Sequence, residues 1–187
     1  VKLDRDTTVY AKWIEKTDLG FTDVADSSPF RAAIGWAVKE GITNGTSATT
    51  FSPGNTCTTA QILTFLWRAN GSPNSNAACP ASEVAENSPF YKALCWANEK
   101  DLMTKGSGST PCTRAAAVTY LWKLAGSPKM SVNSSFTDVP ASADFAQAVA
   151  WAVEQGVTNG VSASEFAPDS TCTRGQIVTF LYRNLLD

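Results

Sequence analysis

The chain has 187 residues, with 15 Lys and Arg against 17 Asp and Glu, a formal net charge of −2 and 43% hydrophobic residues. This balance excludes binding to nucleic acid or to an acidic membrane surface by bulk positive charge. No apolar run approaches the roughly 20 residues of a transmembrane helix, which excludes membrane insertion. The chain contains no His, the most common general base and zinc partner. The missing His therefore disfavours a zinc site and an enzyme, and we expect no metal and no cofactor.

Residues 1–17 stand apart from the rest of the sequence. Their segment DTTVYAKW has the β-branched and aromatic content of a short strand. We expect these residues to be the end of a preceding β-rich module or a linker, and the chain to be part of a longer protein.

The remainder of the chain is a threefold repeat. The segment FTDVADSSPFRAAIGWAVKEGITNG from Phe21 is matched by FTDVPASADFAQAVAWAVEQGVTNG from Phe136, and a degenerate copy begins at Ala81. The predicted units are copy one (residues 18–73), copy two (residues 74–130) and copy three (residues 131–187). Copies one and three carry the loops FSPGNT and FAPDST, whereas copy two has a shortened loop.

Each copy has two helical patterns. In copy one, the apolar residues of 30–38 recur at the spacing of one helix face. A second helix is predicted to begin at a capping box formed by Thr58 and Gln61, which Thr173 and Gln176 repeat in copy three. Two helices from about 50 residues cannot enclose a core. We therefore predict a mainly α fold in which the three copies share a helical core around a pseudo-threefold axis.

Several short motifs occur in a fixed order: Phe-Thr-Asp-Val, a Trp-bearing helix, Gly-Ile-Thr-Asn-Gly, Phe-x-Pro and Cys-Thr-Arg-x-Gln. Over residues 21–187 they resemble the S-layer homology domain, which occurs in threes as a cell-wall anchor. The resemblance implies a non-catalytic, monomeric module whose inter-repeat grooves bind secondary cell-wall polysaccharide with anionic pyruvate ketals. It also implies an extracellular location, in the cell wall or S-layer of a Gram-positive-type bacterium. Residues 1–17 resemble the YAKW ending of internalin-type β-grasp repeats.

Two arginines point to an anionic ligand. Arg114 and Arg174 directly follow the helix-capping Thr, where the helix dipole costs a cation a few tenths of a kcal/mol. A bound anion would reverse the sign, because backbone N–H groups and a guanidinium both suit a carboxylate. The alternative is a surface Arg at a permissive position. Copy one has Thr59 instead of Arg, and copy two has Ala116 instead of Gln, so copy three is the most complete.

The predicted ligand-binding residues are Arg174, Gln176, Thr173, Arg114, Thr113, Gln61, Asp23, Asp138, Trp36, Trp96 and Trp151. The three indoles could stack on a sugar or pack against the neighbouring unit, and packing is favoured because a shared core needs such wedges. The two aspartates could order the entry to the first helix or accept sugar hydroxyls, and both readings stay open.

The cysteines fall into two groups. Cys57, Cys112 and Cys172 occupy equivalent positions and are predicted to be small buried hydrophobic residues. Cys79 and Cys95 have no counterparts in the other copies. We expect them to form a disulfide worth about 3 kcal/mol, with Cys95 to Cys112 as the rival pair.

Two other functions stay open at this point. The helical exterior could serve as a protein-binding adhesin. A glycan hydrolase is less favoured, because its available acids recur once per unit and form no unique pair. These acids are Asp23, Asp138, Glu40 and Glu154.

Overall fold

The computed structural model describes residues 18–76, 84–102, 108–132 and 135–186. These residues form six helices: α1 (Arg31–Lys39), α2 (Thr59–Ala69), α3 (Tyr91–Glu99), α4 (Arg114–Leu124), α5 (Ala146–Glu154) and α6 (Arg174–Leu186). Extended pairing in this part of the chain is limited to isolated β-bridges, so the expectation of a mainly α fold is confirmed. The strand expected in residues 1–17 lies outside the described residues.

The second helix of each copy begins as the sequence predicts. The Gln61 side chain accepts a hydrogen bond from the Thr58 N–H, and Thr58 Oγ1 accepts one from the Gln61 N–H, which completes the capping box of α2. Thr173 and Gln176 make the same two bonds in copy three. In copy two only the Thr113 half is present. The first helices begin later than the apolar pattern does, because residues 28–30 form a turn before α1.

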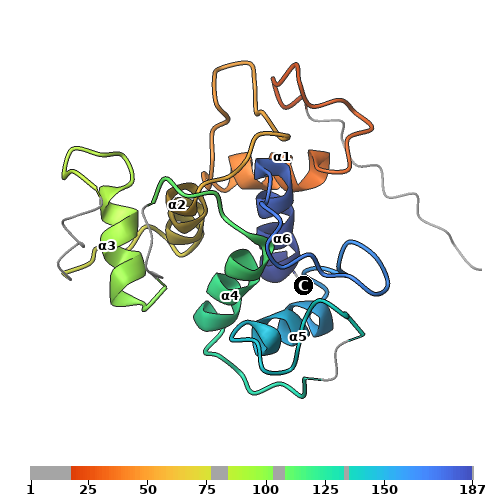
Figure 1. Cartoon of the computed structure of the whole chain (residues 1–187). Coiled ribbons are helices and arrows are strands. Elements are labelled where there is room, and N and C mark those ends of the chain that lie inside the picture. The colour runs from red at the N-terminus through yellow and green to blue at the C-terminus, as the bar shows by residue number, and fades with distance from the viewer. Residues whose placement is uncertain (1–17, 77–83, 103–107, 133–134, 187) are drawn as a thin grey trace, which may run out of the picture.

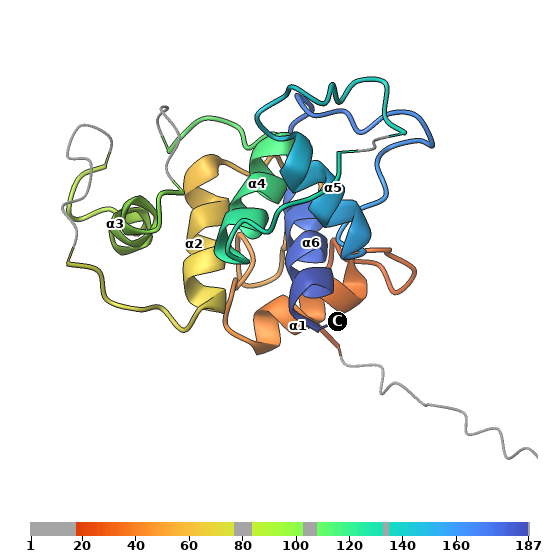
Figure 2. The ribbon, with the colours of Figure 1, turned by 90° about the horizontal axis from the view of Figure 1, so that it is seen from below.

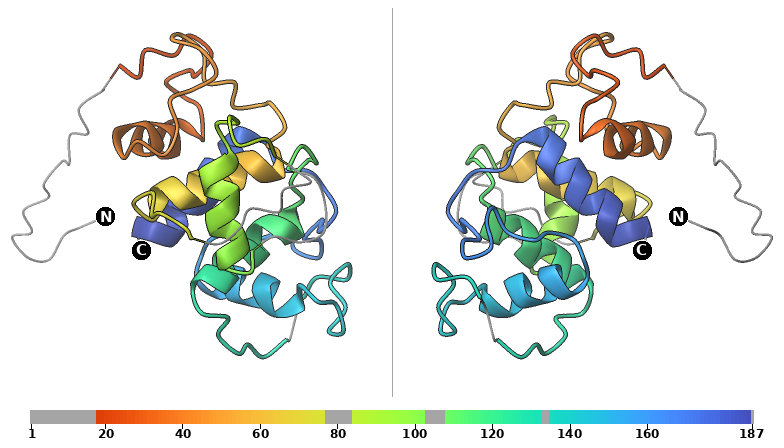
Figure 3. Two further views of the ribbon diagram at one scale, coloured as in Figure 1. Left: turned by 90° about the vertical axis from the view of Figure 1, so that its left-hand side faces the viewer. Right: turned by 90° about the vertical axis from the view of Figure 1, so that its right-hand side faces the viewer.

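The helices form an inner and an outer group. In Figures 1 and 2, α2, α4 and α6 lie in the centre, and α1, α3 and α5 lie around them. The main helix contacts join the second helix of one copy to the first helix of the next: α2 to α3, α4 to α5, and α6 back to α1. The views in Figure 3 show α3 lying across α2. Each first helix is thus covered by the preceding copy, and the last copy covers the first.

A ring of three backbone hydrogen bonds joins the copies at the centre of the molecule. The Cys57 N–H donates to the Cys172 carbonyl, the Cys172 N–H to the Cys112 carbonyl, and the Cys112 N–H to the Cys57 carbonyl, each at 2.8 Å. All three side chains are 0% exposed, which confirms the expectation of small buried hydrophobic residues. Burial raises the pKa of Cys57 to about 12 and that of Cys172 to about 11. These thiols are therefore poor nucleophiles at neutral pH.

The structure describes four of the five cysteines, all except Cys79. Cys57, Cys95, Cys112 and Cys172 form no bond with one another, so the rival pair of Cys95 with Cys112 is absent. Cys79 lies outside the described residues, and its pairing with Cys95 stays a prediction. None of the described helices combines the length and the apolar character needed to cross a bilayer.

Thiol counting checks the cysteine assignment. We expect almost no rapid reaction with a thiol reagent in the native protein, because the three central thiols are buried and have raised pKa values. After denaturation without reductant we expect three reactive thiols. Five would contradict the Cys79 to Cys95 disulfide and would leave the ring of hydrogen bonds unaffected.

The Thr-Asn-Gly turns supply a second test of the packing. Gly160 has φ +81°, and a Cβ there would lie 2.6 Å from the Phe136 ring and 2.7 Å from the Glu165 carbonyl oxygen. Gly156 has φ +69° with nothing within 4 Å of such an atom. Gly156→Ala should therefore cost about 1 kcal/mol of unfolding free energy in urea, for the left-handed backbone alone. Gly160→Ala should cost about 3 kcal/mol, because the clash adds to that strain. Equal losses would show that the turn is not packed as described.

Candidate functional site

The three junctions between copies are built on one plan, in which the start of a second helix meets a loop of the next copy. At the start of α6, the N–H groups of Arg174 and Gly175 donate to the carbonyls of Asn55 and Pro53 in copy one, both at 2.9 Å. The starts of α4 and α2 donate in the same way to carbonyls at 168 and 170 in copy three and at 108 and 110 in copy two. The first N–H groups of these helices are therefore already paired.

Arg174 inserts its side chain from copy three into copy one. Its Nε donates to the Phe51 carbonyl at 3.1 Å, and its Nη2 donates to Thr43 Oγ1 at 3.3 Å. The guanidinium carbon lies 4.9 Å from the Phe51 ring centroid and 5.5 Å from that of Phe65. The residue is 4% exposed. Two aromatic rings and two neutral acceptors thus enclose this cation.

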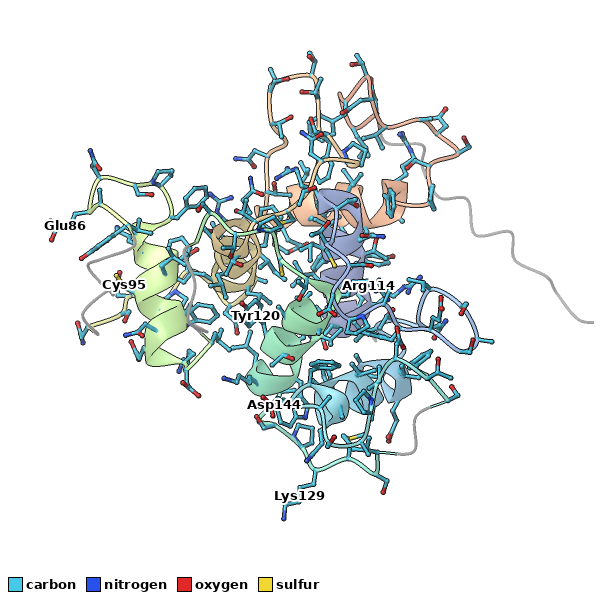
Figure 4. The ribbon with its side chains drawn as sticks, viewed as in Figure 1. Glu86, Cys95, Arg114, Tyr120, Lys129 and Asp144 are labelled. Atoms are coloured by element: carbon cyan, nitrogen blue, oxygen red, sulfur yellow. The ribbon has the colours of Figure 1, made fainter. Side chains whose placement is uncertain are left out.

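Arg114 repeats these contacts from copy two into copy three. Its Nε donates to the Phe166 carbonyl at 2.8 Å, and its Nη2 donates to Thr158 Oγ1 at 3.3 Å. Its guanidinium lies against the rings of Phe166 and Phe180, at 4.8 and 5.6 Å. Figure 4 shows Arg114 in the interior beside α4, whereas Glu86 and Lys129 point outward. The two junctions therefore have the same construction.

The two aspartates hold the loops that receive these arginines. The Asp23 carboxylate accepts the N–H groups of Phe51 and Ser52 at 2.8 and 2.7 Å. Asp138 does the same for Phe166 and Ala167 at 2.9 and 2.7 Å. The N–H groups of these loops therefore bind the aspartate while the phenylalanine carbonyl binds the arginine. Neither interpretation considered for the aspartates included this role, and their contact with a sugar stays a prediction.

The charges of each arginine–aspartate pair act on each other without direct contact. Desolvation raises the pKa of Asp23 and Asp138, but the two N–H donors and the nearby guanidinium outweigh it, so both pKa values lie below the ordinary value of 3.8. Desolvation lowers the pKa of Arg114 and Arg174 from the ordinary arginine value, and both stay charged at neutral pH. Among the described residues, neither guanidinium has a carboxylate oxygen within 4.0 Å.

The arrangement at the helix starts differs from the one expected. The sequence predicts that the guanidinium and the unpaired N–H groups at the helix start bind the same anion. In the structure these N–H groups donate to a neighbouring loop, and the guanidinium is buried beneath that loop. Nη1 of each arginine has no acceptor among the described residues.

The three aligned tryptophans lie at helix packing surfaces. Trp96 and Trp151 are 2% and 6% exposed, so neither offers a free ring face to a sugar. Trp36 is half-buried and packs edge-on against Tyr182 of α6, with 5.7 Å between ring centroids. Gln61, Gln176, Thr113 and Thr173 all serve as caps of their helices. The structure thus gives each predicted site residue a structural contact, the arginines included.

The junction between copies one and two lacks the arginine and has a groove. Thr59 occupies the arginine position, and its Oγ1 lies 3.2 Å from Thr110 Oγ1. A groove of about 390 Å³ lies beside it, between the start of α2 and the segment before α3. Its walls include Gln61, Ser88 and Phe90. Tyr120 of α4, at the position of Phe65 and Phe180, is buried in the interior (Figure 4).

Sequence reasoning missed the residues that receive the arginines: Thr43, Phe51, Thr158 and Phe166. A signal for them existed. The copy with the shortened loop directly follows the copy without the arginine, as expected if each arginine enters the loop of the next copy.

Acid should weaken the two arginine junctions. Because the folded pKa values of Asp23 and Asp138 are depressed, their contribution to stability is complete above about pH 5 and is lost as the pH falls through about 4 and below. The double variant Asp23→Asn/Asp138→Asn should therefore lose less unfolding free energy than the wild type between pH 5 and pH 3. Asp169→Asn, at an exposed position, should follow the wild type. Parallel curves for all three proteins would contradict the assignment.

Comparison with known protein families matches two parts of this chain. The S-layer homology domain model matches residues 20–62 and residues 135–178. Arg174 and all its described contacts except Phe65 lie within these ranges, whereas copy two lies outside them. A comparison with curated proteins gave no match. S-layer homology domains are generally cell-wall anchoring modules that bind secondary cell-wall polymers and are not catalytic. Residues 20–62 and 135–178 are therefore similar to S-layer homology domains, a kind of domain associated with the cell surface.

Proposed function

We propose that the chain is a non-catalytic anchoring module that fastens a longer surface protein to an anionic wall polysaccharide. In this proposal three S-layer homology repeats, residues 18–73, 74–130 and 131–187, surround a pseudo-threefold axis. The ring of hydrogen bonds at the three cysteines and the cyclic helix contacts support that arrangement. The location is extracellular, on a Gram-positive-type wall, and the module acts as a monomer.

The unpaired donor of the buried arginines carries the proposal. Arg114 and Arg174 each use Nε and Nη2 on neutral protein acceptors, while Nη1 has none among the described residues. A buried charge without an ion pair is costly, and an anion that supplies the missing acceptor reduces that cost. The carboxylate of a pyruvate ketal has this chemistry, because a guanidinium forms strong charge-assisted hydrogen bonds to a carboxylate. We assign the anionic sugar to the two junctions that contain an arginine.

Copy three supplies the stronger of the two sites in this proposal. Both Arg174 and its receiving loop lie in segments that match the family model, whereas Arg114 comes from the degenerate copy. The capping box of α6 is complete, and that of α4 is half present. A helix start held by more bonds fixes the arginine more firmly, which favours binding.

Calorimetric titration with purified wall polysaccharide tests this assignment. Arg174→Gln removes the charge but keeps an amide donor, and should weaken binding about tenfold or more, as expected for a charge-assisted hydrogen bond worth about 1.5–3 kcal/mol. Arg114→Gln should weaken binding less. Both variants should unfold at lower temperature, since contacts with two aromatic rings are lost. Binding is therefore measured where each variant is folded.

Arg183→Gln is the matched control. Its guanidinium also donates to a backbone carbonyl, that of Val157, and its loss changes the net charge equally, but it lies at the far end of α6. It should bind like the wild type. Removal of pyruvate from the polysaccharide should abolish the difference between wild type and Arg174→Gln. A folded Arg174→Gln that binds as tightly as Arg183→Gln would overturn the assignment, and binding to a host protein instead of the polysaccharide would favour the adhesin.

A further inference from the structure

The groove between copies one and two has a chemistry of its own. It has a volume of about 390 Å³, near the lower end of the roughly 300–1,000 Å³ range of small-ligand sites. Every described residue that lines it is uncharged. Phe90 and Val84 provide apolar surface, while Gln61 and Ser88 provide polar groups. An apolar wall with a few polar groups is the usual composition of a site for a small neutral molecule.

Two polar side chains of the groove have hydrogen-bond donors without an acceptor among the described residues. The capping box fixes the orientation of the Gln61 amide, because its Oε1 accepts the Thr58 N–H at 3.0 Å. Its amino group has no acceptor among the described residues. Ser88 Oγ accepts the Phe90 N–H at 3.3 Å, which leaves its own hydroxyl hydrogen to donate. Amide and hydroxyl donors beside an aromatic ring suit a sugar, which offers hydroxyl acceptors and an apolar C–H face.

Two changes in the chain produce this chemistry at one junction. Thr59 replaces the arginine, so no cation lies at the start of α2. The shortened loop of copy two lacks the phenylalanine against which a guanidinium packs in the other two copies. A carboxylate in this groove would lose its hydration without gaining an ion pair, which is unfavourable. An uncharged group loses much less.

We propose that the groove between copies one and two binds an uncharged sugar residue, in contrast to the anionic sugar assigned to the arginine junctions. This inference rests on the proposed function as a polysaccharide-binding module. It divides the ligand into two classes: a carboxylated sugar at Arg174 and Arg114, and a neutral sugar at Gln61. A polymer with both kinds of residue then occupies neighbouring junctions of one molecule.

Titration of the isotope-labelled chain by NMR tests the proposal. The probes are methyl glycosides of glucose, galactose, mannose and N-acetylglucosamine, with methyl glucuronide as the carboxylated counterpart of the glucoside. We expect at least one uncharged glycoside to produce saturable shifts at the Gln61 side-chain amide and the backbone amides of Ser88 and Gly108. Methyl glucuronide should bind the groove at least tenfold more weakly. Absence of shifts with all four uncharged glycosides would overturn the proposal.

A pair of matched variants identifies the groove. Gln61→Glu keeps the capping-box acceptor, since Glu also fits that motif, but it removes the amide donors and adds a negative charge. It should weaken binding of the uncharged glycoside at least tenfold without loss of folded signal. Gln176→Glu makes the same change in the capping box of α6, which lies outside the groove, and should leave this binding unchanged. Equal effects of the two variants would contradict the site.

Thr59→Arg tests whether the absence of a cation is what excludes a carboxylate from the groove. A cation at the start of α2 should bring methyl glucuronide to at least the affinity of the uncharged glycoside, and an unchanged preference would count against the proposal.

Failure of the neutral-sugar site can be distinguished from failure of the proposed function. Wall polysaccharide that binds through Arg174 without groove shifts would refute the neutral site alone. Groove shifts in a chain that does not bind the polysaccharide would refute the anchoring function.

Discussion

The ring of three hydrogen bonds between the peptide groups of Cys57, Cys112 and Cys172 is the constraint on which the rest of the structure depends. It sets three chain segments side by side, and the second helix of each copy starts two residues after its cysteine. With the three helix starts fixed in this way, each first pair of N–H groups meets a loop of the next copy. No copy completes its own core, because its first helix is covered by the second helix of the copy before it. Stability and site geometry therefore come from the same junctions.

In each arginine junction the aspartate, the loop and the buried arginine depend on one another. The aspartate binds the N–H groups of the loop, the loop carbonyl binds the guanidinium, and the guanidinium lies on the loop phenylalanine. Removal of any one member leaves buried polar groups of the others without partners, so these residues are expected to be lost together. The junction between copies one and two fits this logic, since both the arginine and the loop are missing there.

Much of this fold was predictable because its signals are local. The capping box of Thr58 and Gln61 involves residues three apart, and the apolar spacing of 30–38 describes one helix face. The destination of Arg174 was not predictable in the same way. Its contacts lie 123 and 131 residues away in the chain, and local pattern alone gives an arginine in a first helical turn a solvent-exposed position. One sequence signal did indicate this contact with the next copy. Copy one lacks the arginine, and the copy that follows it lacks the long loop that would receive that arginine.

The same constraint explains how a degenerate copy two can persist in the fold. This copy has no long loop and only half of a capping box, and its segment lies outside the family matches. It still supplies Cys112 to the ring, α4 as the support of α5, and α3 as the cover of α2. A ring of three peptide groups cannot close with two members, so deletion of copy two would expose both α2 and α5. Loss of its loop exposes only one groove. The side chains of this junction are therefore free to change while its backbone contacts are held by the fold.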